Sequence, residues 1–316
     1  MQLVIIINSK HFTLTKPIIM KTASMKKTML LQNRYDFVYL YDVTDGNPNG
    51  DPDAGNAPRM DPETGHGLVT DVCLKRKVRN YIQLLKEDKP PYSIYIKDKV
   101  VLNDLNELAY KALKLKPKEK KLPKSPLDAI ALSKWMSTNF YDVRTFGAVM
   151  TTAVNCGSVS GPVQLSFSRS QDPILSTPHS IIRKAVTNEK DREKERTMGI
   201  KHTTPYGLYR CHGHINVGSA EKSEFTEDDL ELFFSALENM FDHDRSATRG
   251  EMSVCGLYVF KHESRLGNAH AKQLFNSVKI TRVNSDIPVR EFSDYQVTVN
   301  HDQIPDGVEL LVRYAV

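Results

Sequence analysis

Two segments of the chain carry apolar and aromatic residues on both faces of an extended backbone. They are RYDFVYLYDV at 34–43 and MSVCGLYVF at 252–260. Because successive side chains of a strand point to opposite faces, a strand that is apolar on both faces belongs inside a sheet covered on both sides. The two segments therefore predict central, buried strands.

Two other segments alternate between apolar and polar residues, as strands with one polar face do. The first is PVQLSFSR at 162–169, and the second covers 206–217. In the second, the apolar face carries Tyr209, Cys211, Ile215 and Val217, and the polar face carries Arg210, His212, His214 and Asn216. Because Cys211 points away from the histidines, we expect them to face the surface or RNA rather than a metal.

Three segments have the start signals of helices. Thr70 can cap a helix that runs to about Lys86. Its apolar face carries Leu74, Val78, Tyr81, Ile82 and Leu85. Thr226 precedes a helix with an acidic first turn, which the helix dipole favours. Ser125-Pro126 opens the third helix, with proline at its first position.

Without its insertions, the chain runs strand, helix, strand, strand, helix, strand. This order predicts an α+β fold with a ferredoxin-like (RNA-recognition-motif-like) βαββαβ core. Large insertions are expected at about 88–160 and at about 171–205, where SIIRKAVT can form a hairpin. Extra C-terminal strands are expected near 278–283, 294–299 and 308–315.

Residues 1–33 look separate from this single domain, which we place at 34–316. The first 32 residues carry five lysines and no acidic residue. The apolar run at 3–7 is too short for a signal sequence, and no basic segment precedes it. We expect a disordered or upstream-translated extension, with Met25 or Met29 as alternative starts.

Charge is unevenly distributed along the chain. Residues 75–124 carry fifteen Lys or Arg and six Asp or Glu, and residues 183–210 carry eight and four. Residues 36–71, in contrast, carry eight acidic residues and one arginine. Alternating basic and acidic segments indicate a polyanion bound along particular surfaces, although a single lysine-rich loop can equally be solvated.

The composition of the 316 residues excludes several classes of protein. No apolar run approaches the roughly 18 residues of a membrane span. The four cysteines are far apart and form no CxxC pair, which argues against a disulfide framework or zinc ribbon and favours a reducing cytoplasm. Phosphate-loop and dinucleotide motifs are missing from the sequence. We expect a non-enzyme with no cofactor and no metal.

The loop TDGNPNGDPDAGN at 44–56 holds the most suggestive chemistry. It places Asp45, Asn47, Asn49 and Gly50 at the first positions of an EF-hand calcium loop. Asn56, however, stands where a glutamate is needed, and a strand rather than a helix precedes the loop. Asp45, Asp51 and Asp53 can instead hold a catalytic divalent metal. Turn chemistry alone also explains these residue types.

Basic side chains on the first helix and around the insertions are candidates for contacts with backbone phosphates. They are Lys75, Arg76, Arg79, Arg144, Arg169, Arg183 and Lys184. Phosphate contacts give salt-dependent affinity without reading a sequence. For each residue alone a surface salt bridge is the alternative, but their joint placement favours binding. The aromatic signature of RNA-recognition modules is absent, so bases are not expected to stack on the sheet.

Long blocks of the sequence resemble one family. They are DGNPNGDPDAGNAPRMDPETGHGLVTDVCLKRKVRNY, YDVRTFGAVM, GPVQLSFSRSQDPI, RKAVTNEKD and GIKHTTPYGLYRCHGHIN. From about Arg34 to the C-terminus the chain is similar to the Cas-seven family of RAMP proteins. This family forms the backbone of type I CRISPR surveillance complexes (Cascade), and the resemblance is to its type I-C form.

The resemblance implies an RNA-recognition-like palm, a fingers insertion at about 88–160 and a thumb hairpin at about 171–205. It implies a ribonucleoprotein in the prokaryotic cytoplasm, in which several copies form a helical stack on the spacer of a CRISPR RNA (crRNA). Each thumb displaces one base, and the intervening bases pair with target DNA in antiviral defence. The implied partners are further copies, a Cas-five-type crRNA-processing subunit, and the large and small Cascade subunits, with no membrane.

The thumb should also present apolar wedges. Our candidates are Met198 and Ile200, beside Lys201 and His202. The alternative function is that of type III relatives, which are metal-dependent endoribonucleases that cut paired RNA with a loop aspartate. Asp45, Asp51 or Asp53 would take that role here. A calcium-binding structural module is the third interpretation.

Overall fold

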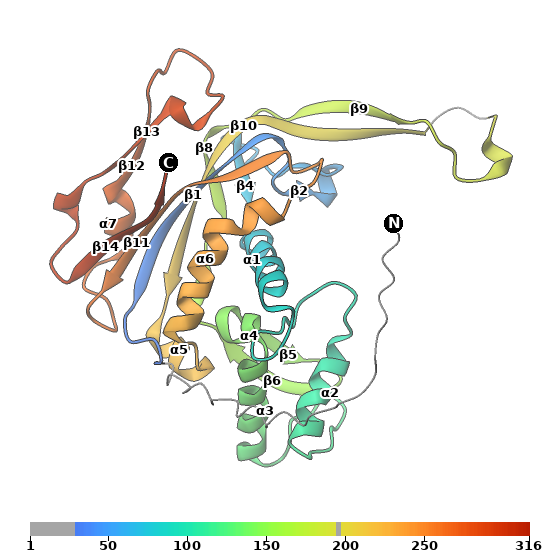
Figure 1. Cartoon of the computed structure of the whole chain (residues 1–316), viewed down its shortest axis with the longest axis vertical. Coiled ribbons are helices and arrows are strands. Elements are labelled where there is room, and N and C mark those ends of the chain that lie inside the picture. The colour runs from blue at the N-terminus through green and yellow to red at the C-terminus, as the bar shows by residue number, and fades with distance from the viewer. Residues whose placement is uncertain (1–28, 194–196) are drawn as a thin grey trace, which may run out of the picture.

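One antiparallel sheet organises the molecule (Figure 1). The computed structural model describes residues 29–193 and 197–316. The strand order is β14-β11-β1-β10-β8-β4, and the short strand β7 also pairs with β10. These strands are β1 (Tyr35–Gly46), β4 (His66–Val69), β7 (Val163–Leu165), β8 (Ser168–Pro173), β10 (Thr197–Ile215), β11 (Glu251–His262) and β14 (Val308–Ala315). The predicted α+β class is confirmed.

The two strands predicted to be buried on both faces lie at the centre of the sheet. Strand β1 runs between β10 and β11, and every residue from Tyr35 to Tyr41 is buried. One face of the sheet packs against α1 (Asp71–Lys86) and α6 (Glu227–His243). The other face is covered by α7 (Ala271–Ser277) and the hairpin β12 (Val278–Arg282)–β13 (Tyr295–Val299). Apolar residues on both faces thus reflect cover on both sides.

The helix starts are confirmed at the predicted caps. The Thr70 hydroxyl accepts a hydrogen bond from the backbone N–H of Cys73, and Thr226 forms a capping box with Asp229. The apolar face of α1 is narrower than predicted, because Leu85 is 50% exposed. Lys77, which lies on the buried side of this helix, is 3% exposed and was not predicted to be there.

The segment between α1 and β7 forms a subdomain with its own apolar core. We call residues 88–160 the helical subdomain. It contains α2 (Leu102–Ala112), α3 (Pro126–Asn139), α4 (Tyr141–Phe146) and the hairpin β5 (Gly147–Thr151)–β6 (Asn155–Ser160). Ser125 caps α3, as predicted. The core of the subdomain includes Tyr110, Met136 and Cys156, which are separate from the cores of the main sheet.

The two strands of the β5–β6 hairpin come into close backbone contact at the base of the hairpin. A Cβ atom at Gly161 would lie 2.2 Å from the backbone nitrogen of Gly147, the residue whose strand partner is Ser160. Only glycine leaves space for such a close approach.

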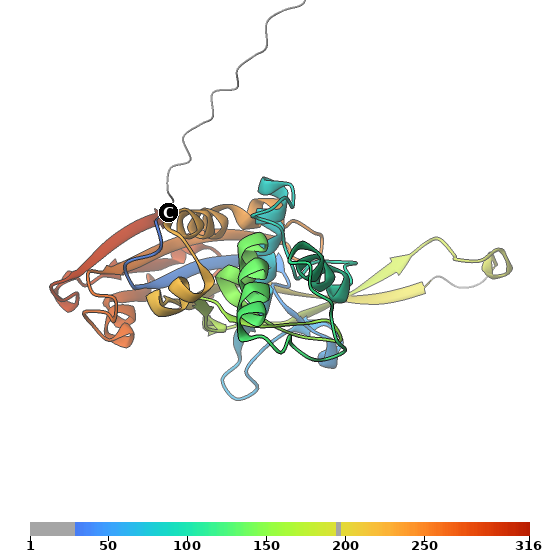
Figure 2. The same cartoon turned by 90° about the horizontal axis from the view of Figure 1, so that it is seen from below.

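A two-stranded arm projects from the sheet (Figures 1 and 2). It is formed by β9 (Thr177–Arg183) and the first part of β10, which pair from Thr177↔Thr203 to Arg183↔Thr197. Strand β10 is 19 residues long, so it continues from the arm into the sheet. The strand predicted at 206–217 is its inner part, and Val217 begins α5 (Val217–Ser223) instead of ending the strand.

The boundary expected at residue 33 is wrong. Leu31 is fully buried, and its N–H donates to the carbonyl of Phe225. The Asn33 side chain donates to the carbonyl of His262. Residues 29–33 therefore belong to the fold, whereas the prediction of a disordered or upstream-translated extension for 1–28 lies outside the described residues.

One short ladder completes the described strands. It pairs β2 (Gly50–Asp51) with β3 (Ala57–Pro58) and closes the 44–56 loop on itself. The strand predicted at 162–169 is divided between β7 and β8. Across the described ranges 29–193 and 197–316, we find no helix with the length and apolar character needed to cross a membrane.

Candidate nucleic-acid interface

The three basic residues predicted on α1 differ in their availability. The Arg76 side chain is 60% exposed and pairs with Asp98 at 3.0 Å. The Lys75 and Arg79 side chains are each 12% exposed. Lys75 pairs with Asp71 on the same helix, and Arg79 pairs with the buried carboxylate of Asp142. Only Arg76 of this group presents most of its side chain to solvent.

Arg144 is a correction to the sequence prediction. It lies on α4, is 5% exposed, and makes two hydrogen bonds to the Asp229 carboxylate at 2.8 and 2.9 Å. Its remaining donors reach the carbonyls of Pro91 and Ser137, both at 2.9 Å. The guanidinium is thus satisfied inside the protein and fastens the helical subdomain to α6. We no longer assign it to a phosphate.

Arg169 lies on β8 at the base of the arm. Its side chain is 53% exposed, and its Nη1 lies 2.6 Å from Asp61 Oδ2. This hydrogen bond lowers the pKa of Asp61 to about 2. An exposed pair of this kind contributes little to stability, so Arg169 can exchange Asp61 for another anion at small cost.

The remaining predicted residues lie on the arm. Arg183 and Lys184 are exposed near its outer part, where Arg183 donates to the Thr187 hydroxyl. Met198 and Ile200 are 67% and 66% exposed. A two-stranded ribbon has no third layer to cover such apolar side chains, so they are available to a partner.

Lys201 and His202 lie at the base of the arm and are half-buried. The Lys201 ammonium donates to the carbonyl of Ala247. This contact joins the arm to the loop between α6 and β11, which we call the junction loop (residues 244–250). The junction loop also carries Arg245 and Arg249, which the sequence analysis missed. Their signal was an Asp-Arg and Thr-Arg-Gly pattern between a helix and a strand.

The 44–56 loop is a scaffold for the start of α1. The Asn49 side-chain oxygen accepts hydrogen bonds from the N–H and the hydroxyl of Thr70, at 2.9 and 3.0 Å. The Asn47 amide donates to the carbonyl of Asn56 at 2.7 Å. The oxygen that Asn49 would give to calcium is therefore occupied by the helix cap, which contradicts the calcium-loop interpretation.

The three aspartates of this loop are spread along it. Asp45 is exposed at φ +49°, and Asp53 is also exposed. Asp51 accepts a hydrogen bond from the N–H of Asp53 and lies 3.4 Å from Arg59. In the part of the chain that the structure describes, no three His, Cys, Asp or Glu side chains gather as a metal site.

The polar face of β10 is covered in part: Arg210 and His212 are packed under other elements, contrary to the sequence prediction, whereas the His214 side chain is 46% exposed, as predicted. The Arg210 guanidinium donates to the carbonyls of Phe275 and Val278, at 2.5 and 2.9 Å. His212 stacks on Phe275, and His214 is hydrogen-bonded to the buried carboxylate of Asp36. Helix α7 and β12 thus cover Arg210 and His212, where solvent or RNA was expected.

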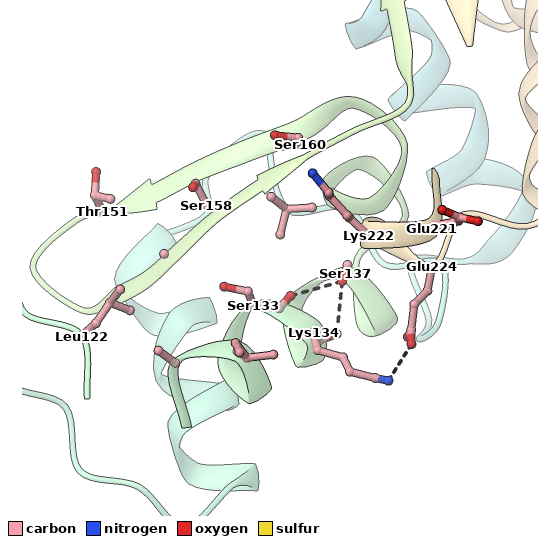
Figure 3. A pocket seen from close by; sticks show the side chains of 14 residues that line it. Leu122, Ser133, Lys134, Ser137, Thr151, Ser158, Ser160, Glu221, Lys222 and Glu224 are labelled. Atoms are coloured by element: carbon pink, nitrogen blue, oxygen red, sulfur yellow. Dashed lines mark hydrogen bonds and ion pairs between the residues drawn. The ribbon is translucent and has the colours of Figure 1, made fainter. Parts of the chain in front are cut away.

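A groove of about 600 Å³ lies between α3, the β5–β6 hairpin and α5 (Figure 3). Its lining mixes charges, since Lys134 and Lys222 stand beside Glu221 and Glu224. Lys134 pairs with Glu224 at 2.5 Å, which links α3 to the end of α5. A phosphate backbone needs a continuous row of cations, so we place the candidate interface on the arm, its base and α1 instead.

The chain is therefore an α+β protein in which one antiparallel sheet carries a basic arm and an added helical subdomain. The family model for CRISPR-associated protein Cas7 matches residues 33–300. The chain belongs to this family.

The chain is also similar to individual known proteins. The chain is 26% identical over 330 residues to a CRISPR-associated protein Cas7 of Haloferax volcanii. The aligned region covers 91% of this chain and 85% of that relative. Among solved structures, it is similar to a chain of a CRISPR RNA-guided surveillance complex, pre-nicking, at 12% identity and a TM-score of 0.46, over 72% of this chain and 78% of that chain. It is also similar to a chain of a type III-B Cmr-beta bound to cognate target RNA, at 11% identity and a TM-score of 0.39. This match covers 72% of this chain and 61% of that chain.

Proposed function

We propose that the protein is a non-catalytic backbone subunit that binds crRNA, assembles with further copies along the spacer, and presents it to target DNA in antiviral defence. Membership of the Cas7 family supports this proposal. The structural observation that carries it is the arm, which holds exposed basic and apolar side chains well away from the sheet.

The chemistry of these surfaces suits a guide of any sequence. Arg76, Arg169 and Lys184 offer exposed positive side chains. Such contacts hold the phosphates, and sequence is left to base pairing. Met198 and Ile200 are the side chains that would separate neighbouring bases.

We further propose a ferredoxin-like palm. Strands β11, β1, β10 and β8 lie side by side in this order, and α1 and α6 pack on one face of them. Together they follow the βαββαβ path along the chain. In this assignment the helical subdomain forms the fingers, and the arm forms the thumb.

The finer assignments follow from the sequence blocks quoted above. We propose the type I-C form of the complex, with a Cas-five-type processing subunit and the large and small Cascade subunits as partners. The prokaryotic cytoplasm is the proposed location, which suits a protein with four free cysteines.

The rival function is a metal-dependent endoribonuclease. Asp45 is its best candidate, because this residue is exposed at the end of β1. The deciding experiment is purification of the protein with its neighbouring subunits and a CRISPR array, followed by sequencing of the bound RNA. Spacer RNA without a fixed sequence supports the proposal.

The same complex is then incubated with complementary RNA and Mg²⁺. We expect no cleavage of the complementary strand. Cleavage that disappears in Asp45→Ala, but persists in the matched loop variant Asp53→Ala, would establish the rival function.

A further inference from the structure

Lys77 is a buried lysine whose role neither the fold nor the proposed interface explains. Its side chain is 3% exposed and its ammonium lies over the ring of Phe241, 5.7 Å from the ring centre. The ammonium binds the carboxylate of Asp244 at the end of α6. Burial lowers the pKa of Lys77, and the hydrogen bond to Asp244 opposes this shift. An apolar residue would fill the same place with no charge to compensate.

Asp244 binds a second cation. Arg249 Nη1 lies 2.9 Å from Asp244 Oδ1. The Arg249 side chain is 35% exposed, whereas that of Asp244 is 8% exposed. Two positive charges therefore share one negative charge, which leaves a net charge of +1 (+1 −1 +1) in the cluster. Arg249 is the member that brings this charge to the surface.

The junction loop that carries Arg249 is held by two other segments. The N–H of Asn47 donates to the carbonyl of Thr248 at 2.8 Å. The Lys201 ammonium donates to the carbonyl of Ala247. The loop is thus fixed to the end of β1, to α1 and to the base of the arm at once. Arg249 has little freedom to move away from this junction.

The Arg249 guanidinium has unused N–H donors and carries the uncompensated positive charge of the cluster, so it is suited to binding a phosphate. We propose that Arg249 binds a phosphate of the guide RNA, and that Lys77 is a positioning residue that keeps the Arg249 charge uncompensated through Asp244. This inference rests on the proposed function, because the base of the arm is where the guide would pass. Lys77 itself never touches the RNA.

The test uses the full chain and a fluorescently labelled single-stranded crRNA, whose affinity is measured by anisotropy over a range of salt concentrations. Arg249→Ala should weaken binding roughly tenfold, as expected for one charge-assisted hydrogen-bonded contact. The slope of log affinity against log salt should fall by about 0.7, the value for one phosphate on a single strand. Arg249→Lys should restore the slope.

Lys77→Met leaves Asp244 and Arg249 as a neutral pair, so it should lower the salt slope as Arg249→Ala does. Arg265→Ala is the matched control, because Arg265 is 57% exposed and pairs with Glu221 of α5, a helix that lies away from the arm. It should change neither affinity nor slope. Arg249→Ala keeps the Lys77–Asp244 pair, so it decides the question even where Lys77→Met does not fold.

A purely structural role predicts a lower melting temperature with an unchanged salt slope. If wild-type protein binds the RNA and Arg249→Ala binds it equally well, the inference is wrong and the proposed function stands. If wild-type protein does not bind the RNA at all, the proposed function fails, and this inference fails with it.

Discussion

The imidazole ring of His212 lies flat on the ring of Phe275, with 4.1 Å between the ring centres and 7° between the planes. Burial, with the Arg210 charge beside it, lowers the pKa of His212 to about 4 from 6.5. His212 Nε2 also accepts a hydrogen bond from Arg210 Nε at 2.9 Å, which requires the neutral ring. Helix α7 is thus held on the sheet by an uncharged histidine.

This stack predicts a loss of stability in mild acid. Between about pH 6.5 and pH 4 the unfolded chain binds a proton at His212 that the folded chain does not bind, so the free energy of unfolding falls as pH falls. We expect a loss of about 1 kcal/mol from neutral pH to about pH 5, after allowance for the partial exposure of the ring. Urea unfolding at both pH values measures it, and His212→Gln should flatten the difference. An equal loss in both proteins would contradict the assignment to His212.

The Arg144–Asp229 pair predicts a large effect on stability. Arg144→Ala leaves the Asp229 carboxylate, which is 2% exposed, without its guanidinium. An unpaired buried charge of this kind costs about 3–5 kcal/mol. Urea unfolding should show this loss, while the control Arg76→Ala on the surface should change the free energy of unfolding by less than about 0.5 kcal/mol. Similar values for the two variants would mean that Arg144 is not the fastening point of the helical subdomain.

The base of the β5–β6 hairpin predicts a glycine that tolerates no side chain. A Cβ at Gly161 would lie 2.2 Å from the nitrogen of Gly147 and 2.5 Å from the carbonyl oxygen of Thr145, and backbone cannot move aside as a side chain can. We expect Gly161→Ala to cost more than about 2 kcal/mol in a thermal or urea melt. Gly218→Ala on α5 is the control, since its nearest neighbour is 3.3 Å away and alanine favours a helix. A mild effect at Gly161 would show that the backbone at the base of this hairpin can move apart.

Because Arg76 of α1 is exposed, we expect its substitution to change RNA binding without changing the stability of the protein. Arg76→Glu should weaken crRNA binding and lower its salt slope, because repulsion replaces an attraction to phosphate. Arg265→Glu is the matched control, since both arginines are more than half exposed and pair with one carboxylate. Filter binding over a salt series measures both. Equal effects would indicate general charge attraction rather than a defined surface on α1.

The apolar side chains of the arm predict an effect on base exposure. Met198→Ser with Ile200→Ser should leave affinity within about threefold, because phosphate contacts dominate it. If these side chains displace bases at regular intervals, as the family resemblance implies, chemical probing of the assembled RNA should then lose this pattern. The control is Leu266→Ser, an 87% exposed residue in the loop between β11 and α7. A pattern that survives the arm variant would place the wedge elsewhere.

The sequence predicted the elements whose pattern is local. Strands β1 and β11 carry apolar residues on both faces, and Thr70 and Thr226 cap helices with their own side chains. These signals need no knowledge of distant residues, which explains why they were found.

The errors arose where a distant partner decides the outcome. Arg144 looked like any surface arginine, because Asp229, its partner, lies 85 residues away in the sequence. The polar face of β10 alternates like an exposed strand, but α7 and β12 supply carbonyls that satisfy Arg210 in the interior. The burial of Lys77 was missed for the same reason. It lies among other basic residues in the sequence, and its partner Asp244 is distant. Alternation shows which side chains are polar, but not what covers them.

Strand β10 passes from the arm into the sheet without a break, from Thr197 to Ile215. The direction of the arm is therefore set by the twist of the sheet rather than by a hinge. A deletion of one residue between the arm and the sheet would turn every side chain of the outer part to the opposite face. If copies of the chain stack as proposed, each would therefore present its arm in a direction that is set when the chain folds, before any guide is bound.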